Sequence, residues 1–475
     1  MKRFSEHRDK RKRNHLIDVW LLLLFVIVLT LGLFFIPTQW GDWELKKADI
    51  LSELRRTQAE TQTASEKQTS ARENNLKDSL ARMSRIDSIR SSLQKKHNAT
   101  ARQLSDTVPL LSYIEDYTPS RKGLVSLFQG LKQHTSPVYI AFVGDSFIEG
   151  DIFTFDVRRL LQQKWGGWGS GWLPLASNVS GFRKGLKHTF SAWDESTIIN
   201  KKGNSSSFLL SGRCFKNKGA AQVTYEIEQP LSSSPQVGKL FYNSPKEIPI
   251  SYTMADSTVQ VILPAGAELQ CLSIALTSSK IKLQFPSATT PEAVFYGFSA
   301  EGNKGVAVDN FSMRSNSGLA LSSMNSSSNN RFHQLRPYKL IVLQFGLNVA
   351  NAKQTDYSSY GKRMIAIVEQ IKKDFPNAAI LIMGVSDRGQ RKNGNFETMD
   401  GILALRDEQR RIAQKAQVLF WDTFTAMGGA NSMREFVASG HAAKDYTHIT
   451  FSGGRFLAER FVEALLFEKS CYDSL

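Results

Sequence analysis

The sequence predicts an α/β domain with a parallel sheet, interrupted by an inserted all-β (jelly-roll-like) domain and preceded by a single transmembrane helix and a helical stalk. An uncharged apolar run fills residues 19–36, and from Val138 onward apolar strands alternate with amphipathic helices. Between two such stretches lie short β-prone runs separated by turn residues. The expected segments are a cytoplasmic basic tail (1–15), the transmembrane helix (16–38), the stalk (43–106), the first part of the α/β domain (107–180), the inserted β-domain (181–305) and the second part of the α/β domain (306–475).

The apolar run "VWLLLLFVIVLTLGLFFI" has the length of one membrane-spanning helix. Basic residues precede it, so the positive-inside rule places the N-terminus in the cytoplasm and the rest of the chain outside. The sequence therefore predicts a single-pass protein of the cytoplasmic or inner membrane, with its catalytic domain in the periplasm. A cleaved signal peptide is the alternative, but "FFIPTQWGD" lacks the small-x-small cleavage pattern.

Residues 43–106 are polar and contain a helical stripe of apolar residues. The stripe favours a helix or short coiled coil that holds the domain off the membrane, and a flexible linker remains the alternative. Its members recur at three- and four-residue spacing: Leu76, Leu80, Met83, Ile86, Ile89 and Leu93.

The α/β domain is predicted from its periodicity. Continuous apolar runs indicate strands that are buried on both faces, and amphipathic runs indicate the covering helices. The expected strands are 138–143, 339–345, 378–384 and 417–422, and the expected helices are 156–165, 360–375, 401–416 and 453–469. Asp151, just before the first of these helices, is expected to cap it.

The insert, 181–305, contains no convincing helix and reads as an antiparallel sandwich or jelly roll. Its turns carry Ser, Asn and Lys, so a carbohydrate-binding role and a purely structural role both stay open.

The net charge of +16 is partly concentrated in the N-terminal tail. No base-reading motif accompanies it, so nucleic acid is not an expected partner. A dispersed positive surface suits an anionic polymer such as a cell-wall glycan, or a membrane surface. No cluster of His, Cys, Asp or Glu has metal-ligand spacing, so neither a metal nor a cofactor is expected.

Residues suited to nucleophilic catalysis follow the predicted strands. Ser146 comes just after 138–143 in "GDS", and Gly346 and Asn348 follow 339–345. Near the C-terminus, Asp445 and His448 are three residues apart in a loop before the last helix. Because the carboxyl ends of parallel strands meet at one edge of a sheet, we expect a serine, its base, the carboxylate that orients the base and an oxyanion donor to meet there.

These motifs, in this order, resemble the four blocks of the SGNH (GDSL-like) hydrolases over about residues 136–180 and 306–470. The resemblance implies a three-layer α/β/α fold, with Ser146 as nucleophile, His448 as base and Asp445 as its orienting group. It also implies three oxyanion donors: the Ser146 backbone N–H, a block-two glycine N–H, for which Gly318 is the choice although Gly302 and Gly305 lie nearby, and the Asn348 side chain. The sequence departs from the family's pattern at two positions. Phe147 follows the serine where the family usually has Leu, and Val349 stands where an acidic residue is common.

A narrower resemblance is to cell-envelope SGNH enzymes of the peptidoglycan O-acetylesterase and O-acetyltransferase branch, in which a carbohydrate-binding-like module interrupts the catalytic domain. It is carried by "GDSFIEGDIFTFDVRRLLQQKWGGWGSGW" and the β-rich insert that follows. Trp168 and Trp172 are candidates for a sugar-stacking rim, although they also fit a packed turn. Asp387, after 378–384, is a further rim candidate, although an N-cap or an ion pair with Arg388 fits as well.

Three functions follow. The first is a membrane-anchored serine esterase that removes O-acyl groups, in particular O-acetyl groups, from an envelope glycan such as peptidoglycan. The second is an O-acetyltransferase that uses the same acyl-serine, fed by a membrane-embedded acyltransferase. The third is a glycan-binding envelope protein without catalysis, which the presence of Ser146, His448 and Asp445 together disfavours.

Overall fold

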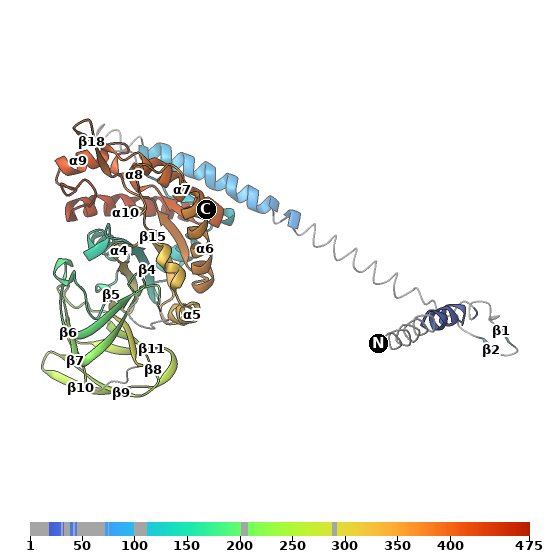
Figure 1. Cartoon of the computed structure of the whole chain (residues 1–475), viewed down its shortest axis with the longest axis horizontal. Coiled ribbons are helices and arrows are strands. Elements are labelled where there is room, and N and C mark those ends of the chain that lie inside the picture. Colours follow the sequence, from blue (N-terminus) through green and yellow to red (C-terminus); the bar gives the residue numbers. More distant parts are fainter. Residues whose placement is uncertain are drawn as a thin grey trace, which may run out of the picture. The chain divides into compact units, whose positions relative to one another are not determined.

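The computed structural model describes residues 19–29, 32, 39–40, 43–44, 72–74, 76–98, 112–200, 208–286 and 292–475. The chain divides into two units, Met1–Asp78 and Ser79–Leu475. In the first unit, helical residues 19–29 and the antiparallel pair β1 (Gln39–Trp40) and β2 (Trp43–Glu44) are described. The second unit carries all the chemistry considered below (Figure 1).

The prediction of a single-pass transmembrane helix at 16–38 is wrong. At 1.5 Å per residue, the described helical stretch 19–29 spans roughly half of a ~30 Å hydrocarbon core. Within the described ranges, no helix is both long and apolar enough to cross a membrane. The predicted location in the cytoplasmic or inner membrane, with the catalytic domain in the periplasm, is corrected with it.

Part of the expected stalk is a helix that belongs to the second unit. In helical residues 79–98, Ile86 is buried, and the Arg90 guanidinium donates to Glu468 in the C-terminal helix (3.0 Å). Leu93 of the predicted stripe packs on the hydrophobic core that includes residues of the C-terminal helix. Residues 45–71, 75 and 99–106 of the expected stalk lie outside the described residues.

A six-stranded sheet forms the centre of the α/β domain, and its antiparallel edge strand β3 (Glu115–Asp116) pairs with β19. The other neighbouring strands run parallel, so the predicted parallel sheet is confirmed. Consecutive residues of β4 are buried, which means that both faces of this strand are covered. The sheet order is β14 (Gly305–Ser312), β4 (Pro137–Gly144), β15 (Tyr338–Gln344), β16 (Ala379–Met383), β19 (Leu419–Trp421) and β3.

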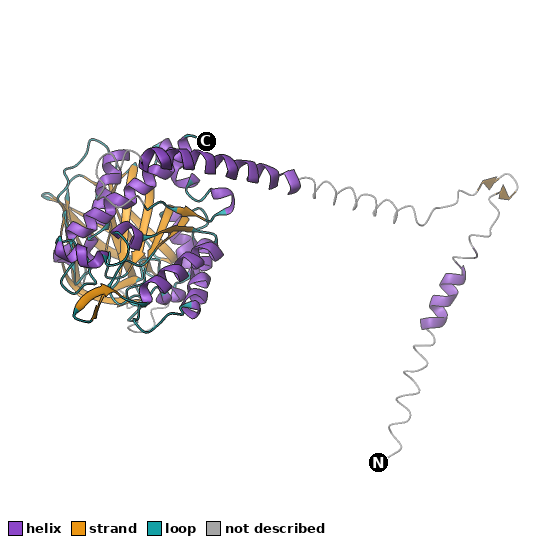
Figure 2. Cartoon of the chain, turned by 90° about the horizontal axis from the view of Figure 1, so that it is seen from above, coloured by secondary structure: helices purple, strands orange, loops and turns teal. Residues whose placement is uncertain are grey.

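Two groups of helices pack on this sheet (Figure 2). The first group contains α3 (Val125–Gln133), α4 (Thr154–Trp165) and α10 (Phe451–Asp473). In this group α10 contacts α3 and α4, α3 contacts β4 and β15, and α4 contacts β14. The second group contains α5 (Ser326–Leu335), α6 (Ser358–Asp374) and α7 (Gly401–Ala416), with α7 against β16 and β19. The short helices α8 (Thr423–Met427) and α9 (Ser432–Ala438) connect β19 to the loop before α10.

The inserted chain forms a separate nine-stranded antiparallel sheet, drawn in green and yellow in Figure 1. The alternation of buried and exposed residues along β7 and β12 shows that one face of these strands packs on a core while the other is solvated. The strands are β5 (Gly171–Leu173), β6 (Leu186–Thr197), β7 (Arg213–Ile227), β8 (Gln236–Ser244), β9 (Ile248–Met254), β10 (Ser257–Leu263), β11 (Gly266–Leu276), β12 (Lys280–Phe285) and β13 (Val294–Gly302).

A buried ion-pair cluster joins the two sheets. Arg336, which follows α5 and is fully buried, donates to Asp309 of β14 (2.6 and 2.8 Å) and to Glu301 of β13. Tyr338 of β15 also donates to Asp309 (2.6 Å), and Tyr139 of β4 donates to Glu301 (2.8 Å). Because buried charges are stable only when they are paired, this cluster fixes how the antiparallel sheet meets the parallel one.

Candidate active site

The nucleophile candidate lies at the carboxyl end of β4. Strand β4 ends at Gly144, where a Cβ would come within 2.7 Å of the Gln344 side chain, so glycine permits the close approach of β15. Asp145 and Ser146 follow in a short turn, and the Ser146 Oγ is 3.0 Å from Nε2 of His448. The structure therefore brings together a hydroxyl and an imidazole that are 302 residues apart in the chain.

Asp445 holds the His448 ring from the other side. Its Oδ2 is 2.7 Å from His448 Nδ1, and its Oδ1 accepts from the backbone N–H groups of Thr447 and His448 (3.0 Å each). Partial burial raises the pKa of Asp445, but the two N–H donors and the imidazole outweigh it, so the pKa lies below its ordinary value. Asp445 is thus an ionised partner for the ring, as a serine–histidine relay requires.

Asp145 is fully buried between the turn and the next strand. Its Oδ1 accepts from the Phe147 N–H (2.9 Å), and its Oδ2 accepts from the Asn348 amide (3.1 Å). Burial raises the pKa of Asp145 to about 6, although these hydrogen bonds act in the opposite direction. Asp145 therefore ties the nucleophile turn to the loop that follows β15.

The predicted oxyanion donors lie in different surroundings. Asn348 lines the Ser146 pocket, but its amide nitrogen donates to both Asp145 and the Asn316 carbonyl (3.2 Å). The Gly318 N–H donates to the Asn316 side chain (2.9 Å), and Gly318 is outside the pocket lining. Ser315, with a left-handed φ of 59°, lines the pocket instead. A motif defined by a glycine does not indicate this serine.

The rim prediction does not hold for the two tryptophans. Trp168 is 1% exposed and Trp172 is 2% exposed, and both belong to hydrophobic cores. The glycines between them explain why. A Cβ at Gly169 would lie 2.2 Å from the Ala300 carbonyl, and one at Gly171 would lie 2.3 Å from that of Val308. The segment is pressed against β13 and β14, so its indoles point into the protein.

Asp387 is also not at a rim. It is fully buried, and it accepts from the Met433 N–H (2.8 Å) and the Arg388 N–H (2.9 Å). Burial raises its pKa above the ordinary value. Its role is to hold the start of α9 against the loop after β16.

The pocket around Ser146 has a volume of about 420 Å³. Phe182 stands at its wall with 63% of its surface exposed, and Glu149 and Arg314 form an ion pair there. An exposed aromatic ring beside a nucleophile offers a flat apolar surface to a substrate. No sequence pattern indicated Phe182, which ends the short 3-10 helix Ser180–Phe182 before β6.

A second serine–histidine pair lies elsewhere in the second unit. His441 Nδ1 is 2.8 Å from Ser452 Oγ, but no carboxylate among the described residues pairs with His441. Neither residue lines the Ser146 pocket. The arrangement of serine, histidine and carboxylate is therefore a property of Ser146, His448 and Asp445.

Comparison with known proteins bears on the fold. The chain is similar to a solved structure of a peptidoglycan O-acetylesterase, with a TM-score of 0.64 and 24% identity over 75% of this chain and 99% of that chain. This likeness confirms that the chain resembles a peptidoglycan O-acetylesterase in its fold. No protein-family model and no curated protein matches the chain.

Two further solved structures are more distant. A family two carbohydrate esterase from Cellvibrio japonicus has a TM-score of 0.26 and 9% identity, over 60% of this chain and 99% of that chain. An acetyl xylan esterase has a TM-score of 0.27 and 16% identity, over 34% and 81%. These scores are too low to carry an argument.

Proposed function

We propose that the chain is a serine esterase of the SGNH type that removes O-acetyl groups from a cell-envelope glycan such as peptidoglycan. The observation that carries the proposal is the continuous relay from Ser146 Oγ through His448 to Asp445, with distances of 3.0 and 2.7 Å. These separations match those that proton transfer from a serine nucleophile requires. The glycan substrate is supported by the fold likeness to a peptidoglycan O-acetylesterase.

The reaction runs in two halves. Ser146 Oγ attacks the acetyl carbon while its proton passes to Nε2 of His448, and the sugar oxygen leaves with that proton, so that an acetyl-serine remains. A water molecule then gives its proton to His448 and attacks the acetyl-serine, which releases acetate and restores the serine. Asp445 keeps Nδ1 protonated and stabilises the imidazolium in both halves.

Hydrolysis is proposed rather than transfer to a sugar hydroxyl because the relay is open to solvent. The side chains of His448 and Asp445 are 44% and 49% exposed. Water therefore reaches the base directly from the bulk solvent. Phe182 and the ion pair of Glu149 with Arg314, which line the same pocket as Ser146, would receive the sugar.

The test measures acetate released by the full chain from an aryl acetate and from O-acetylated peptidoglycan. Ser146→Ala should abolish both activities, while Ser452→Ala, which removes the hydroxyl of the other serine–histidine pair, should retain them. If wild type and Ser146→Ala are equally inert, the serine chemistry is wrong. If the aryl acetate is cleaved and the glycan is not, the substrate is wrong. If acetyl groups move to a sugar with no free acetate, the protein is a transferase.

A further inference from the structure

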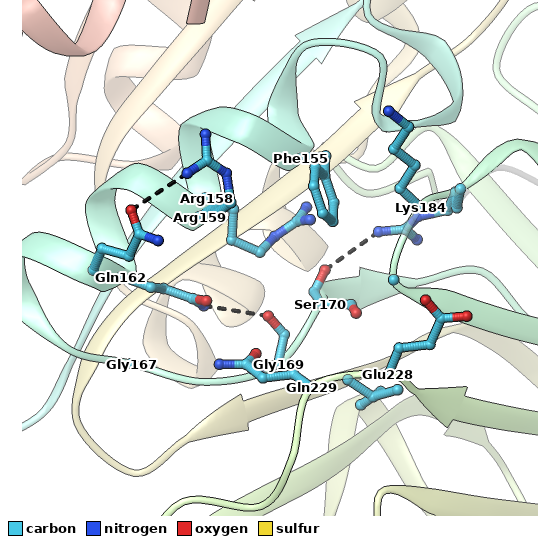
Figure 3. Close-up of a pocket in the computed structure, with 14 residues that line it drawn as sticks. Phe155, Arg158, Arg159, Gln162, Gly167, Gly169, Ser170, Lys184, Glu228 and Gln229 are labelled. Atoms are coloured by element: carbon cyan, nitrogen blue, oxygen red, sulfur yellow. Dashed lines mark hydrogen bonds between the residues drawn. The ribbon is translucent and has the colours of Figure 1, made fainter. Parts of the chain in front are cut away.

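A second cleft, of about 700 Å³, lies between α4 and the antiparallel sheet (Figure 3). Its walls come from α4, from the glycine-rich segment before β5, from the residues just before β6 and from the end of β7 with the chain that follows it. Of the described residues, none that lines this cleft also lines the Ser146 pocket. The cleft is therefore a separate site, built jointly by the α/β domain and the insert.

The inner wall of the cleft carries more positive than negative charge. Arg158 and Arg183, which are nearly buried, share the single carboxylate of Asp151 (3.1 and 2.8 Å). Burial alone would raise the pKa of Asp151, but the two guanidinium groups hold it well below its ordinary value. Two cations on one carboxylate leave a positive charge in excess beside the cavity.

The rim adds two cations. Lys184 is exposed, its ammonium lies 4.2 Å from the centre of the Phe451 ring, and it has no acidic partner in the described part of the chain. Arg159 is 36% exposed and pairs with the buried Asp156 (2.8 Å). Among the described lining residues, Glu228 is the one carboxylate that faces these groups. The cleft as a whole is suited to an anion.

Amide side chains supply neutral hydrogen-bonding groups. Gln229 Oε1 accepts from the Gly169 N–H (3.0 Å) and Gln163 Oε1 accepts from Arg159 (3.4 Å), which leaves their amide nitrogens for another acceptor. Gln162 donates to the Gly169 and Val306 carbonyls (3.2 Å each), which leaves its oxygen as an acceptor. Figure 3 shows Gln162, Gln229 and Lys184 around the same cavity. Donors and acceptors spaced in this way match the hydroxyl and amide groups of a sugar.

We propose that this cleft binds a carboxylate-bearing segment of the glycan whose acetyl group reacts at Ser146. The cations of Lys184 and Arg159 receive the carboxylate, and the glutamine side chains receive the sugar. The proposal rests on the proposed function for the identity of the polymer. Binding at a second site would hold a long chain near the nucleophile without taking part in its chemistry.

The test is a calorimetric titration of the full chain with soluble glycan fragments from peptidoglycan whose O-acetyl groups have been removed with mild alkali. Such fragments cannot be turned over, so binding is measured independently of catalysis. Lys184→Gln should raise the Kd about fivefold, and the double variant with Arg159→Gln about tenfold or more, because each change removes a charged donor. Lys187→Gln is the matched control. It lies three residues further along the chain, in β6, pairs with Glu226 (2.9 Å) and is outside the cleft lining.

The proposal is overturned if the fragments do not bind, if Lys184→Gln binds them as wild type does, or if Lys187→Gln weakens binding equally. It is also overturned if fragments whose carboxylates have been converted to methylamides bind as tightly. Thermal melting of each variant shows whether a loss of binding reflects a loss of folding. If the wild-type protein releases no acetate but binds the fragments in a Lys184-dependent way, the proposed function is contradicted and the cleft assignment stands. If it releases acetate in a Ser146-dependent way but does not bind the fragments, the cleft assignment is contradicted and the proposed function stands.

Discussion

Asp445→Asn removes the negative charge that faces His448 while keeping a side chain of the same shape. In the wild-type protein, Asp445 Oδ2 lies 2.7 Å from Nδ1 of the ring, and the imidazole becomes positively charged in both halves of the proposed reaction. Opposite charges about 4 Å apart attract by ~1 kcal/mol in water and by ~4 kcal/mol near a protein surface. The two side chains are 49% and 44% exposed, so an intermediate value of about 1.5–3 kcal/mol applies.

That energy corresponds to a loss of about 10- to 150-fold in kcat, since each 1.36 kcal/mol changes a rate tenfold. The assay is the steady-state hydrolysis of an aryl acetate by the full chain, with Ser146→Ala giving the floor. Asp407→Asn, which changes an exposed carboxylate on α7, is the control and should leave kcat unchanged. A loss above about a thousandfold would mean that Asp445 acts in a dry site, and a loss below about threefold would mean that it does not support His448. Either result refutes the reasoning.

Three further predictions concern the fold and its charges. Trp172→Ala should lower the free energy of unfolding in urea by about 3–5 kcal/mol, because Trp172 packs against Phe241, Phe311 and Phe332, whereas a rim residue would cost almost nothing. Arg336→Met should cost a similar ~3–5 kcal/mol by the same measurement, because Asp309 and Glu301 keep buried charges without their cation. Burial raises the pKa of Glu468 to about 7 from 4.5, so the folded state loses stability as the pH rises from 4.5 through 7. Glu468→Gln should therefore melt at a higher temperature than wild type at pH 8.5 and at the same temperature at pH 4.5.

The strands that could be predicted from the sequence are those that are apolar on both faces. β4, β15, β16 and β19 are continuous apolar runs, and their periodicity is enough to identify them. β14 was not predicted, because Asp309 and Asn310 interrupt its apolar pattern. The cation that neutralises Asp309 is Arg336, which is 27 residues further along the chain. A local pattern cannot show that such a charge is paired and therefore buried.

The site could be predicted where a residue type and its place in the chain, after a strand or before the last helix, were both distinctive. That was true of Ser146, His448 and Asp445, which the structure brings into contact. It was not true of the surroundings. Trp168 and Trp172 of the glycine-rich segment fitted a sugar-stacking rim and a packed turn equally well, because glycine does not reveal which backbone it lets approach. Asp151, expected as a helix cap, instead receives Arg158 and Arg183, and the latter is 32 residues away.

The hydrogen bonds of Asn348 indicate how the pocket must respond to a substrate. An amide nitrogen carries two hydrogens, and here one goes to the Asp145 carboxylate (3.1 Å) and the other to the Asn316 carbonyl (3.2 Å). An oxyanion formed at Ser146 can gain a hydrogen bond from Asn348 only by replacing one of these acceptors. A neutral carbonyl is a weaker acceptor than an ionised carboxylate, so the Asn316 contact is the one to yield. The loop that would move is the one that carries Ser315 at a left-handed φ of 59°, whereas the buried Asp145 keeps Asn348 and the nucleophile turn in register.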